Sequence, residues 1–484
     1  MKATRPNWIA GTLELSSKVR YGLTSRGVPL FRFVPYDRKL GPFAVGCSSR
    51  NLFYNVHAII EPEQRSPLVP PPSGGELPRG LLVQLLGQPT PESEQTVLLT
   101  SYAFDSQKEL RHEHKLSPQT PLVDLTNRGR PIGFTFHIDP PGCRDVDDAI
   151  TVHKHEDKWH IWIHIADVST WVDEGSEVDS MAKAKATTFY SPTGQALAPM
   201  LPRDLSEGFA SLLPSTEEKP AVSLYFTWNS KTRECSTFTL RETAIRCDRS
   251  FTYDEATQNV NNFPELAVLA DISDSENSHV WVEHLMILYN TFTGIQLKKS
   301  KGAGLLRRHS AKRSEAIKTL PPELYFLAYE SAEHCLTTEE ETKHFGLERE
   351  AYAYATSPLR RYADLVNQRA LHSLIYEKQL PVTSLELVEH LNRREKQAKA
   401  FSRDLFFSTA LASSNEGVEG QILSFDNEKK IHKVYVPAWK RIIKVKHLLK
   451  EPFHINQQVN ITWYEDRTKA SWMEKICFSI QNKE

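Results

Sequence analysis

Apolar and polar residues alternate most clearly in the middle of the chain, over residues 134–138 and again over 159–165. Such alternation is typical of strands with one buried face. Farther along, apolar residues recur at helical spacing, namely Leu359, Tyr362, Ala363, Val366, Ala370 and Leu374. The pair Ser357-Pro358 precedes them and is a helix start signal, so we expect a helix capped by Ser357 whose first position is Pro358.

Both ends of the chain show a different pattern, short apolar segments broken by polar turns. Near the N-terminus these segments cover residues 27–34, 43–45, 81–86 and 96–100, and the stretch from Pro62 to Pro78 is the most loop-like in the chain. Near the C-terminus they cover residues 420–425, 430–436, 458–463 and 477–480. Short strands of this kind predict a small β-barrel at each end.

Four carboxylates lie within ten residues beside a Pro-Pro-Gly turn: Asp139, Asp145, Asp147 and Asp148. Like charges this close repel one another, and the cluster is stable if the side chains reach water or hold a cation. A solvated acidic turn is the simpler interpretation of such a motif taken alone. The apolar residues on both sides favour a cation, and a site made of oxygen ligands selects Mg²⁺ or Mn²⁺ over zinc.

Arg360 and Arg361 fall in the first turn of the expected helix, where cations oppose the helix dipole. That placement makes sense if the two guanidinium groups face an anion such as a phosphate, which the free backbone N–H groups would also bind. The alternative is an ordinary amphipathic helix with two solvated arginines. This segment alone does not separate the two interpretations.

Composition is that of a globular protein, with 40% hydrophobic and 25% charged residues over 484 positions, a length that predicts two to four domains. No apolar run reaches the length of a membrane span, and the first residues lack a signal-peptide core. Six cysteines are scattered without a C-x-x-C pair, which favours a reduced compartment without zinc or disulfides. We therefore expect a cytoplasmic or nuclear protein that is neither secreted nor bound to a membrane.

The net charge of −1 hides two basic ends. Residues 1–50 hold nine Lys/Arg against two Asp/Glu, and residues 429–450 hold eight against none. Basic segments interleaved with aromatic residues favour binding to a nucleic-acid backbone, although lysine-rich ends can also serve solubility alone.

Taken together, the motifs resemble the ribonuclease II catalytic domain over roughly residues 125 to 410, most closely the exosome-type eukaryotic branch. The resemblance rests on ordered segments at residues 136–150, 164–169, 200–206, 344–347 and 354–364. It implies an α+β catalytic domain flanked by small all-β OB-fold barrels. The implied boundaries are 1–115 for a cold-shock-like OB domain, 125–412 for the catalytic domain and 416–484 for a C-terminal OB domain that binds RNA.

The activity that this resemblance implies is magnesium-dependent hydrolysis of single-stranded RNA, processive from the 3′ end and releasing nucleoside 5′-monophosphates, with Mn²⁺ as a substitute cofactor. Asp139, Asp145 and Asp148 align with metal ligands, and Asp147 aligns with the indispensable carboxylate, which we interpret as holding the second metal. Arg360 aligns with the catalytic arginine, Arg361 adjoins it as an RNA contact, and Tyr190 aligns with an aromatic residue that stacks on terminal bases.

Several interpretations stay open. A catalytically weakened regulator that binds RNA is the first alternative, and a phosphatase or DNA nuclease with the same acidic chemistry is the second. We expect Asp364 to orient Arg360 from one helical turn away, and His164 and Asp167 to be structural. Residues 307–309 are either a phosphate contact or a solvated basic turn, and residues 193–195 replace basic residues that often grip the substrate.

The chain also has room for a single N-terminal barrel where larger relatives have two. We also expect no additional N-terminal endonuclease domain, so the sequence does not support association with the exosome. The absence of an assembly signal favours a monomer.

Overall fold

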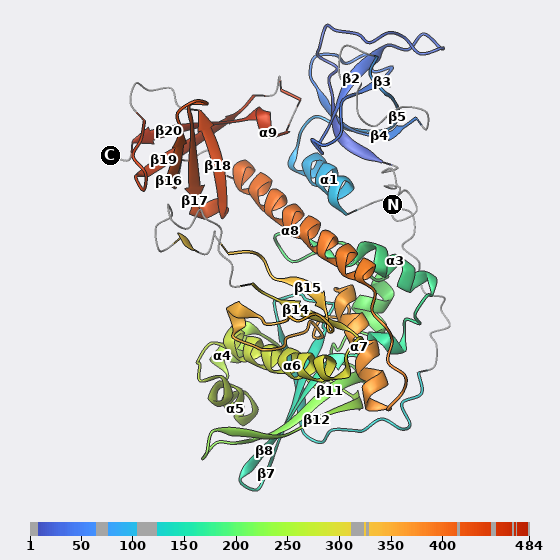
Figure 1. The fold of residues 1–484 in the computed structure, drawn as a ribbon, viewed down its shortest axis with the longest axis vertical. Helices are drawn as coiled ribbons and strands as arrows, with labels where there is room; N and C mark the ends of the chain where they lie inside the picture. The colour runs from blue at the N-terminus through green and yellow to red at the C-terminus, as the bar shows by residue number, and fades with distance from the viewer. Residues whose placement is uncertain are drawn as a thin grey trace.

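The computed structural model describes residues 8–63, 76–103, 123–310, 324–325, 329–413, 417–446, 452–466, 469–470 and 472–482. Parts of the expected domains 1–115 and 416–484 and most of the stretch from Pro62 to Pro78 lie outside the described residues. Figure 1 shows a lower body of mixed helices and strands, with the N-terminal barrel and the C-terminal sheet at its upper end and helix α8 running between them.

The N-terminal unit is a closed five-stranded barrel in the order β1-β2-β3-β5-β4. Its strands are β1 (Ile9–Leu13), β2 (Leu30–Pro35), β3 (Phe43–Gly46), β4 (Val56–Pro62) and β5 (Arg79–Gly87). Phe31, Phe33 and Phe43 are buried in its interior, which gives this small unit a core of its own.

Residues 96–100, expected as a further strand, belong instead to helix α1 (Pro91–Tyr102). Thr90 caps this helix, because its side chain accepts from the Ser93 N–H while the Ser93 side chain accepts from the Thr90 N–H. Pro91 occupies the first turn, where its missing N–H costs nothing. Strong start signals therefore outweigh the β-like composition of Thr96–Thr100.

A six-stranded sheet in the order β12-β11-β8-β7-β6-β13 forms the centre of the lower body. Its strands are β6 (Phe134–Asp139), β7 (Asp148–His155), β8 (Lys158–Ala166), β11 (Lys219–Asn229), β12 (Glu234–Ile245) and β13 (Arg249–Thr252). Within this sheet β13 and β6 pair in parallel, and all the other neighbouring strands are antiparallel. The expected strands at 134–138 and 159–165 are confirmed. Their apolar residues pack against helices α5 (Pro264–Ser273) and α6 (Ser278–Ser300) in the largest hydrophobic core of the described chain.

Shorter elements complete this body around the sheet. They are η1 (Val168–Thr170), α3 (Glu177–Lys185), β9 (Phe189–Tyr190), β10 (Ala196–Ala198), η2 (Leu205–Phe209), α4 (Tyr253–Gln258), β14 (Leu305–Arg308), β15 (Glu333–Leu336), η5 (Phe345–Leu347) and α7 (Tyr362–Ile375).

The C-terminal unit is a five-stranded antiparallel sheet in the order β18-β17-β16-β19-β20. The strands are β16 (Val418–Asp426), β17 (Ile431–Val436), β18 (Arg441–Lys446), β19 (Gln458–Glu465) and β20 (Ile476–Asn482), with η6 (Pro437–Trp439) and α9 (Trp472–Lys475) between them. Four strands cover the four segments expected from the sequence. The expected class, an α+β region flanked by small all-β units, is confirmed.

Helix α8 (Leu385–Ser413) connects all of these units. The Asp404 carboxylate on this helix accepts from Tyr36 Oη at 2.6 Å, from Tyr102 Oη at 2.8 Å and from Arg441 Nη1 at 2.7 Å. These donors come from the loop after β2, from α1 and from β18, so one carboxylate ties both barrels to α8. In the described part of the chain, no helix combines the length and apolar character that crossing a membrane requires.

Candidate active site

The four aspartates gather at one end of the central sheet, because β6 ends at Asp139 and its neighbour β7 begins at Asp148. Ser211 holds the loop between these two strands: its hydroxyl accepts from the Val146 N–H at 3.0 Å and donates to the Arg144 carbonyl at 2.6 Å. Ser211 is fully buried. The fold therefore fixes the acidic loop.

Asp147 is the most buried member of this cluster, with only 4% of its surface exposed. Its Oδ1 accepts from the Leu359 N–H at 2.9 Å and its Oδ2 accepts from Arg360 Nε at 3.0 Å. Burial raises the pKa of Asp147 to about 7, although the charge of Arg360 and the Leu359 hydrogen bond oppose that rise. Each carboxylate oxygen keeps a second lone pair, so the Arg360 pair leaves Asp147 able to bind a cation.

Asp148 lies close enough to Asp139 and Asp147 for their carboxylates to repel one another. Burial, and then the charges of Asp139 and Asp147, raise the pKa of Asp148 well above its ordinary value. Asp139 is held at its Oδ2 by His137 Nδ1 at 2.8 Å, and His137 Nε2 contacts Ser250 Oγ at 2.6 Å. A divalent cation bound here would relieve the repulsion, so the residues fit the expected metal site.

The remaining side chains of the loop indicate which cation would bind. Asp145 accepts a hydrogen bond from Tyr190 Oη, and the Cys143 thiol lies 3.8 Å from Asp145 Oδ1. Burial and then the neighbouring aspartates raise the pKa of Cys143, so this sulfur stays protonated and is a poor ligand at neutral pH. The donor set consists of oxygens, which favours a hard cation such as Mg²⁺ over zinc.

The expected helix start at Pro358 is wrong, because α7 begins at Tyr362 with Arg361 as its N-cap. Ser357–Arg361 forms a single turn in which the Ser357 carbonyl accepts from the Arg361 N–H at 2.9 Å. Arg361 is then extended (φ −135°, ψ 122°) and pairs with Thr187 beside β9. Arg360 therefore lies in a tight turn before the helix, where it reaches Asp147.

Asp364 is the partner of Arg361, which corrects the expectation that it orients Arg360. Its Oδ1 accepts from Arg361 Nη2 at 2.7 Å and from the Ser357 N–H at 2.8 Å. Arg360 is held instead by Asp147 and by Ser357 Oγ, at 2.8 Å from Nη2. The Arg360 side chain stays 43% exposed, so it can contact a ligand outside the protein.

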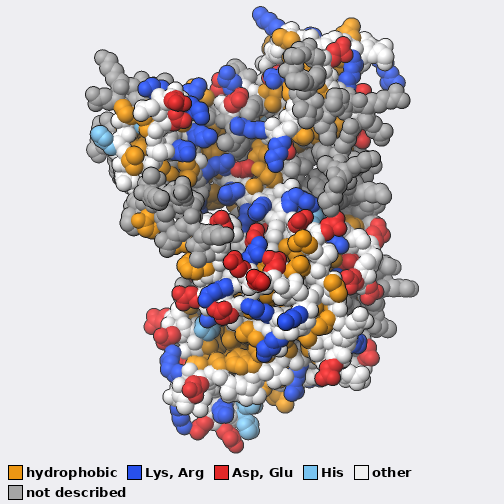
Figure 2. Space-filling model, in the orientation of Figure 1, with side chains coloured by type: hydrophobic (Ala, Val, Ile, Leu, Met, Phe, Trp, Pro, Cys, Tyr) orange, Lys and Arg blue, Asp and Glu red, His pale blue; other side chains and the backbone are white. Residues whose placement is uncertain are grey.

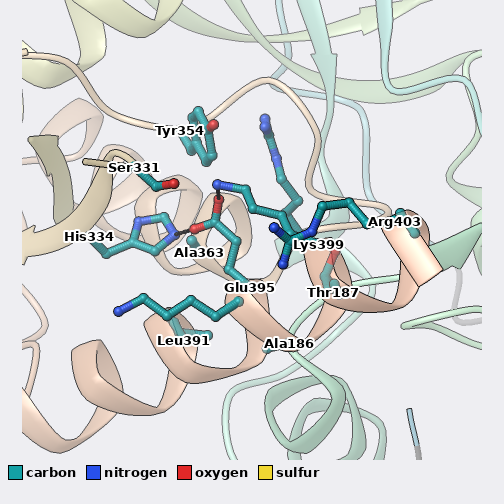
Figure 3. A pocket seen from close by; sticks show the side chains of 14 residues that line it. Ala186, Thr187, Ser331, His334, Tyr354, Ala363, Leu391, Glu395, Lys399 and Arg403 are labelled. Carbon is teal, nitrogen blue, oxygen red and sulfur yellow. Dashed lines mark ion pairs between the residues drawn. The ribbon is translucent and has the colours of Figure 1, made fainter. Parts of the chain in front are cut away.

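A pocket of 710 Å³ lies between α8 and the segment that contains Arg361 (Figure 3). Its cationic lining residues are Arg361, Lys396, Lys399 and Arg403, and Glu395 is the only carboxylate among the described residues that line it. Glu395 pairs with Lys399 at 2.9 Å and with Arg307 at 2.7 Å. Figure 2 shows Lys and Arg side chains gathered in the hollow between the two barrels and along the face below it. This surface suits a polyanion.

The open question about residues 307–309 is answered by their partners. Arg307 is buried, forms two hydrogen bonds with Glu395 and lies over the Tyr354 ring at 4.3 Å. Arg308 pairs with Glu333 and Glu339, and His309 contacts the Glu330 carbonyl. In the described structure, protein groups therefore hold each of the three residues, and Arg307 is buried away from any phosphate.

The proposal that His164 and Asp167 are structural agrees with their surroundings. His164 lies in a buried hydroxyl–imidazole chain across the sheet, 2.7 Å from both Thr151 and Ser223. Asp167 accepts from Arg128 at 2.7 Å and contacts His372 at 2.9 Å, with Glu242 beside them. Asp167, Glu242 and His372 have metal-like spacing, but Arg128 and His372 already supply the neutralising charge.

Sequence reasoning gave no role to His137, Cys143, Ser211 or Tyr253. Of these, Tyr253 directly follows β13. Burial is the largest cause that raises the pKa of Tyr253, and the charges of Asp148 and Asp139 come next, so this side chain lies beside the acidic cluster. The parallel pairing of Thr252 with Asp139 brings it there. That pairing joins segments more than a hundred residues apart, which no local pattern indicates.

Comparison with known proteins places this site in a family. The RNB domain matches residues 123–268 and 322–377, a range that contains the four aspartates, Tyr190, Arg360 and Arg361. Ribonuclease R of Aquifex aeolicus is 25% identical over 414 residues, which cover 66% of this chain and 58% of that protein. The chain thus spans just over half the length of the curated relatives it matches.

Two solved structures share the fold. Mycoplasma genitalium RNase R in complex with ribose-methylated single-stranded RNA is 17% identical, with a TM-score of 0.75 over 98% of this chain and 89% of that one. Yeast Ssd1, a pseudonuclease, is also 17% identical, with a TM-score of 0.70 over 96% of this chain and 68% of that one. Both likenesses extend across the barrels as well as the central body. Through this match, which contains the acidic loop and the arginine turn, the chain is similar to proteins with an RNB domain.

Proposed function

We propose that this chain is a hydrolase that shortens single-stranded RNA from its 3′ end and releases nucleoside 5′-monophosphates processively. The observation that carries the proposal is the contact between the buried Asp147 and the partly exposed Arg360, beside further aspartates and close to a cationic pocket. The relatives named ribonuclease R and exoribonuclease 2 support the same reaction class. The domain arrangement proposed with it is a catalytic region at 125–412 between OB-type units at 1–115 and 416–484.

Arg360 is proposed to bind the scissile phosphate. Its Nε donates to Asp147 and its Nη2 donates to Ser357 Oγ, while nearly half of its side chain remains exposed. A guanidinium held in this way is oriented before the substrate arrives, and it stabilises negative charge that develops on the phosphate oxygens.

Asp139, Asp145, Asp147 and Asp148 are proposed to hold magnesium, with manganese as a substitute. When bound, the metal would lower the pKa of a water molecule and stabilise charge on the phosphate. The contribution of the chain itself is to keep the carboxylates in place: His137 fixes Asp139, Tyr190 fixes Asp145, and Ser211 fixes the loop between them.

Tyr190 and Arg361 are proposed to hold the RNA strand. Tyr190 lies at the acidic loop through its hydroxyl, so its ring is placed next to the reacting phosphate, where a base can stack on it. Arg361 lines the cationic pocket together with Lys396, Lys399 and Arg403, a row that can follow a phosphate backbone. Recognition of this kind is indifferent to base identity.

A second candidate is a protein that binds RNA and cleaves it weakly or not at all. The likeness to yeast Ssd1, a pseudonuclease, favours this candidate, because it shows that the same fold occurs without nuclease function. The intact acidic loop and the Asp147–Arg360 pair favour the enzyme.

The two candidates are separated by incubating the protein with labelled single-stranded RNA in Mg²⁺, in Mn²⁺ or in EDTA, and by measuring binding in parallel. The enzyme predicts mononucleotide release with either metal, none in EDTA, and binding in all three conditions. Binding without release in every condition would support the regulator. A matched single-stranded DNA tests the nuclease alternative, and equal degradation of both polymers would contradict RNA specificity.

A further inference from the structure

Three histidines share one face of the β7–β8 hairpin, far from the acidic loop. His153 lies opposite His160 in the antiparallel register, and His155 lies two residues beyond His153 on the same strand. Side chains alternate along a strand and cross-strand partners share a face, so all three imidazoles project to the same side. Figures 1 and 2 place this hairpin, with pale-blue histidine surface, at the lower tip of the molecule.

The rings are close enough to hold one ion. Their centroids are 5.8 Å apart for His155–His160, 6.4 Å for His153–His160 and 6.5 Å for His153–His155. The ring nitrogens do not all lie within 4.8 Å of one another, so modest side-chain rotations have to close the site. His155 is exposed and the other two are half-buried, which leaves room for those rotations.

The hydroxyl of Tyr225 forms the kind of hydrogen bond that commonly orients metal-binding histidines. Tyr225 on β11 contacts His160 Nδ1 through its hydroxyl at 2.7 Å. Metal-ligating imidazoles commonly form a hydrogen bond through the nitrogen opposite the metal, and this bond fixes the ring orientation. With Nδ1 engaged by Tyr225, Nε2 of His160 is the nitrogen available to an ion.

The surroundings of His160 favour its neutral form. Burial, and then the neighbouring His155, His153 and Lys158, lower the pKa of His160. Lys154 is directed to the opposite face, where its Nζ lies 5.3 Å from the Trp159 ring. Lys158 shares the histidine face across from His155 and is the unfavourable neighbour that a bound cation would have to displace.

We propose that His153, His155 and His160 form a second metal site, specific for a transition-metal ion of the zinc class and independent of the acidic loop. Imidazole donors prefer zinc, copper and nickel, whereas the oxygen donors of the loop prefer magnesium. Because β7 begins at Asp148 and ends at His155, the two sites are separated by the length of that strand, about 20 Å.

The test is a zinc titration of tag-free protein against a chromogenic chelator, with excess Mg²⁺ present to occupy the oxygen site. Wild-type protein should bind one zinc ion that the double variant His155→Ala/His160→Ala does not bind. Tyr225→Phe, which removes no ligand, should weaken this binding roughly 10- to 100-fold. His454→Ala, which removes an exposed histidine elsewhere, should bind as wild type.

Equal zinc binding by wild type and the double variant would overturn the proposal, as would an equal loss in His454→Ala. The single variant His155→Ala changes only an exposed side chain near the hairpin turn and keeps the test valid if the double variant is unstable. Circular dichroism of each variant without zinc establishes that the fold is retained.

Discussion

Asp147 and Arg360 are separated by 213 positions in the sequence, yet one side chain holds the other. We predict that Asp147→Asn abolishes RNA hydrolysis and leaves RNA binding largely intact. The substitution removes the charge that anchors Arg360 and attracts the cation, while the cationic pocket is unchanged. Cleavage and binding are measured in parallel on the same RNA, with Asp173→Asn as an exposed control. Cleavage at a near wild-type rate in Asp147→Asn would remove Asp147 from the active site.

Arg360→Lys keeps the positive charge but loses the planar guanidinium that contacts Asp147 and Ser357 together. We expect turnover to fall by roughly 10²-fold or more, because a lysine cannot reproduce this orientation. Single-turnover cleavage rates at saturating RNA measure the effect. Normal turnover in this variant would mean that Arg360 only stabilises the loop.

Tyr190 combines a ring and a hydroxyl whose roles can be separated. Tyr190→Ala should lengthen the final undegraded fragment, because loss of a stacking platform removes ~1–3 kcal/mol from the binding of the last nucleotides. Tyr190→Phe keeps the ring and loses only the bond to Asp145, so its final fragment should match that of wild type. Gel analysis of 5′-labelled products distinguishes them, and equal lengthening by both variants would assign the role to the hydroxyl.

At the scale of the elements, helix α7 is tied to strand β12 by an ion-pair network. Burial alone would lower the pKa of His372, but its hydrogen bonds to Asp167 and Glu242 raise it to about 9. A raised pKa in the folded state stabilises the protein fully below the unfolded value near 6.5 and ceases to do so as the pH rises through about 9.

The free energy of unfolding of the wild-type protein should therefore decrease between about pH 6.5 and pH 9.5. In His372→Gln the free energy of unfolding should depend less on pH over this range. Urea denaturation across this range measures it. His454→Gln, which changes an exposed histidine, should keep the wild-type slope. A slope unchanged in His372→Gln would show that the network does not couple to folding.

Strands with alternating apolar residues, and the acidic cluster, could be predicted because their signals lie within a few neighbouring residues. The strands at 134–138 and 159–165 and four C-terminal strands follow from alternation, and the acidic cluster is visible in ten residues. The start of α7 was misplaced because Ser357 and Pro358 carry a helix start signal that tertiary contacts override. The Ser357 N–H binds Asp364 and its hydroxyl binds Arg360, so the segment forms a turn.

The rest of the site depends on contacts between distant segments. His137 contacts Ser250 and Tyr253 lies beside Asp148 because β13 pairs in parallel with β6, a pairing that no local spacing encodes. Strand β18 lies outside the expected segments for a different reason. Its buried positions, Ile443 and Val445, are few, and Ile442 is exposed along with two lysines.

At the scale of the whole molecule, Asp404 joins both barrels to α8. Asp404→Leu should loosen the terminal units, since it leaves the partly buried donors Tyr36, Tyr102 and Arg441 without this acceptor. We expect faster proteolysis between the units and a larger radius of gyration in solution scattering. Glu389→Gln, an exposed change on the same helix, is the control. Unchanged scattering and proteolysis in Asp404→Leu would show that other contacts fix the barrels.

The central claim, hydrolysis from a free 3′ end at the acidic loop, is tested most directly by comparing linear and circular RNA of one sequence. With Mg²⁺ and a 3′-terminal label, the linear RNA should release labelled nucleoside 5′-monophosphate from the first turnover, while the circle survives. Asp147→Asn should release nothing from either RNA. Efficient nicking of the circle, or immediate release of labelled mononucleotide from a 5′-labelled copy of the linear RNA, would contradict this account.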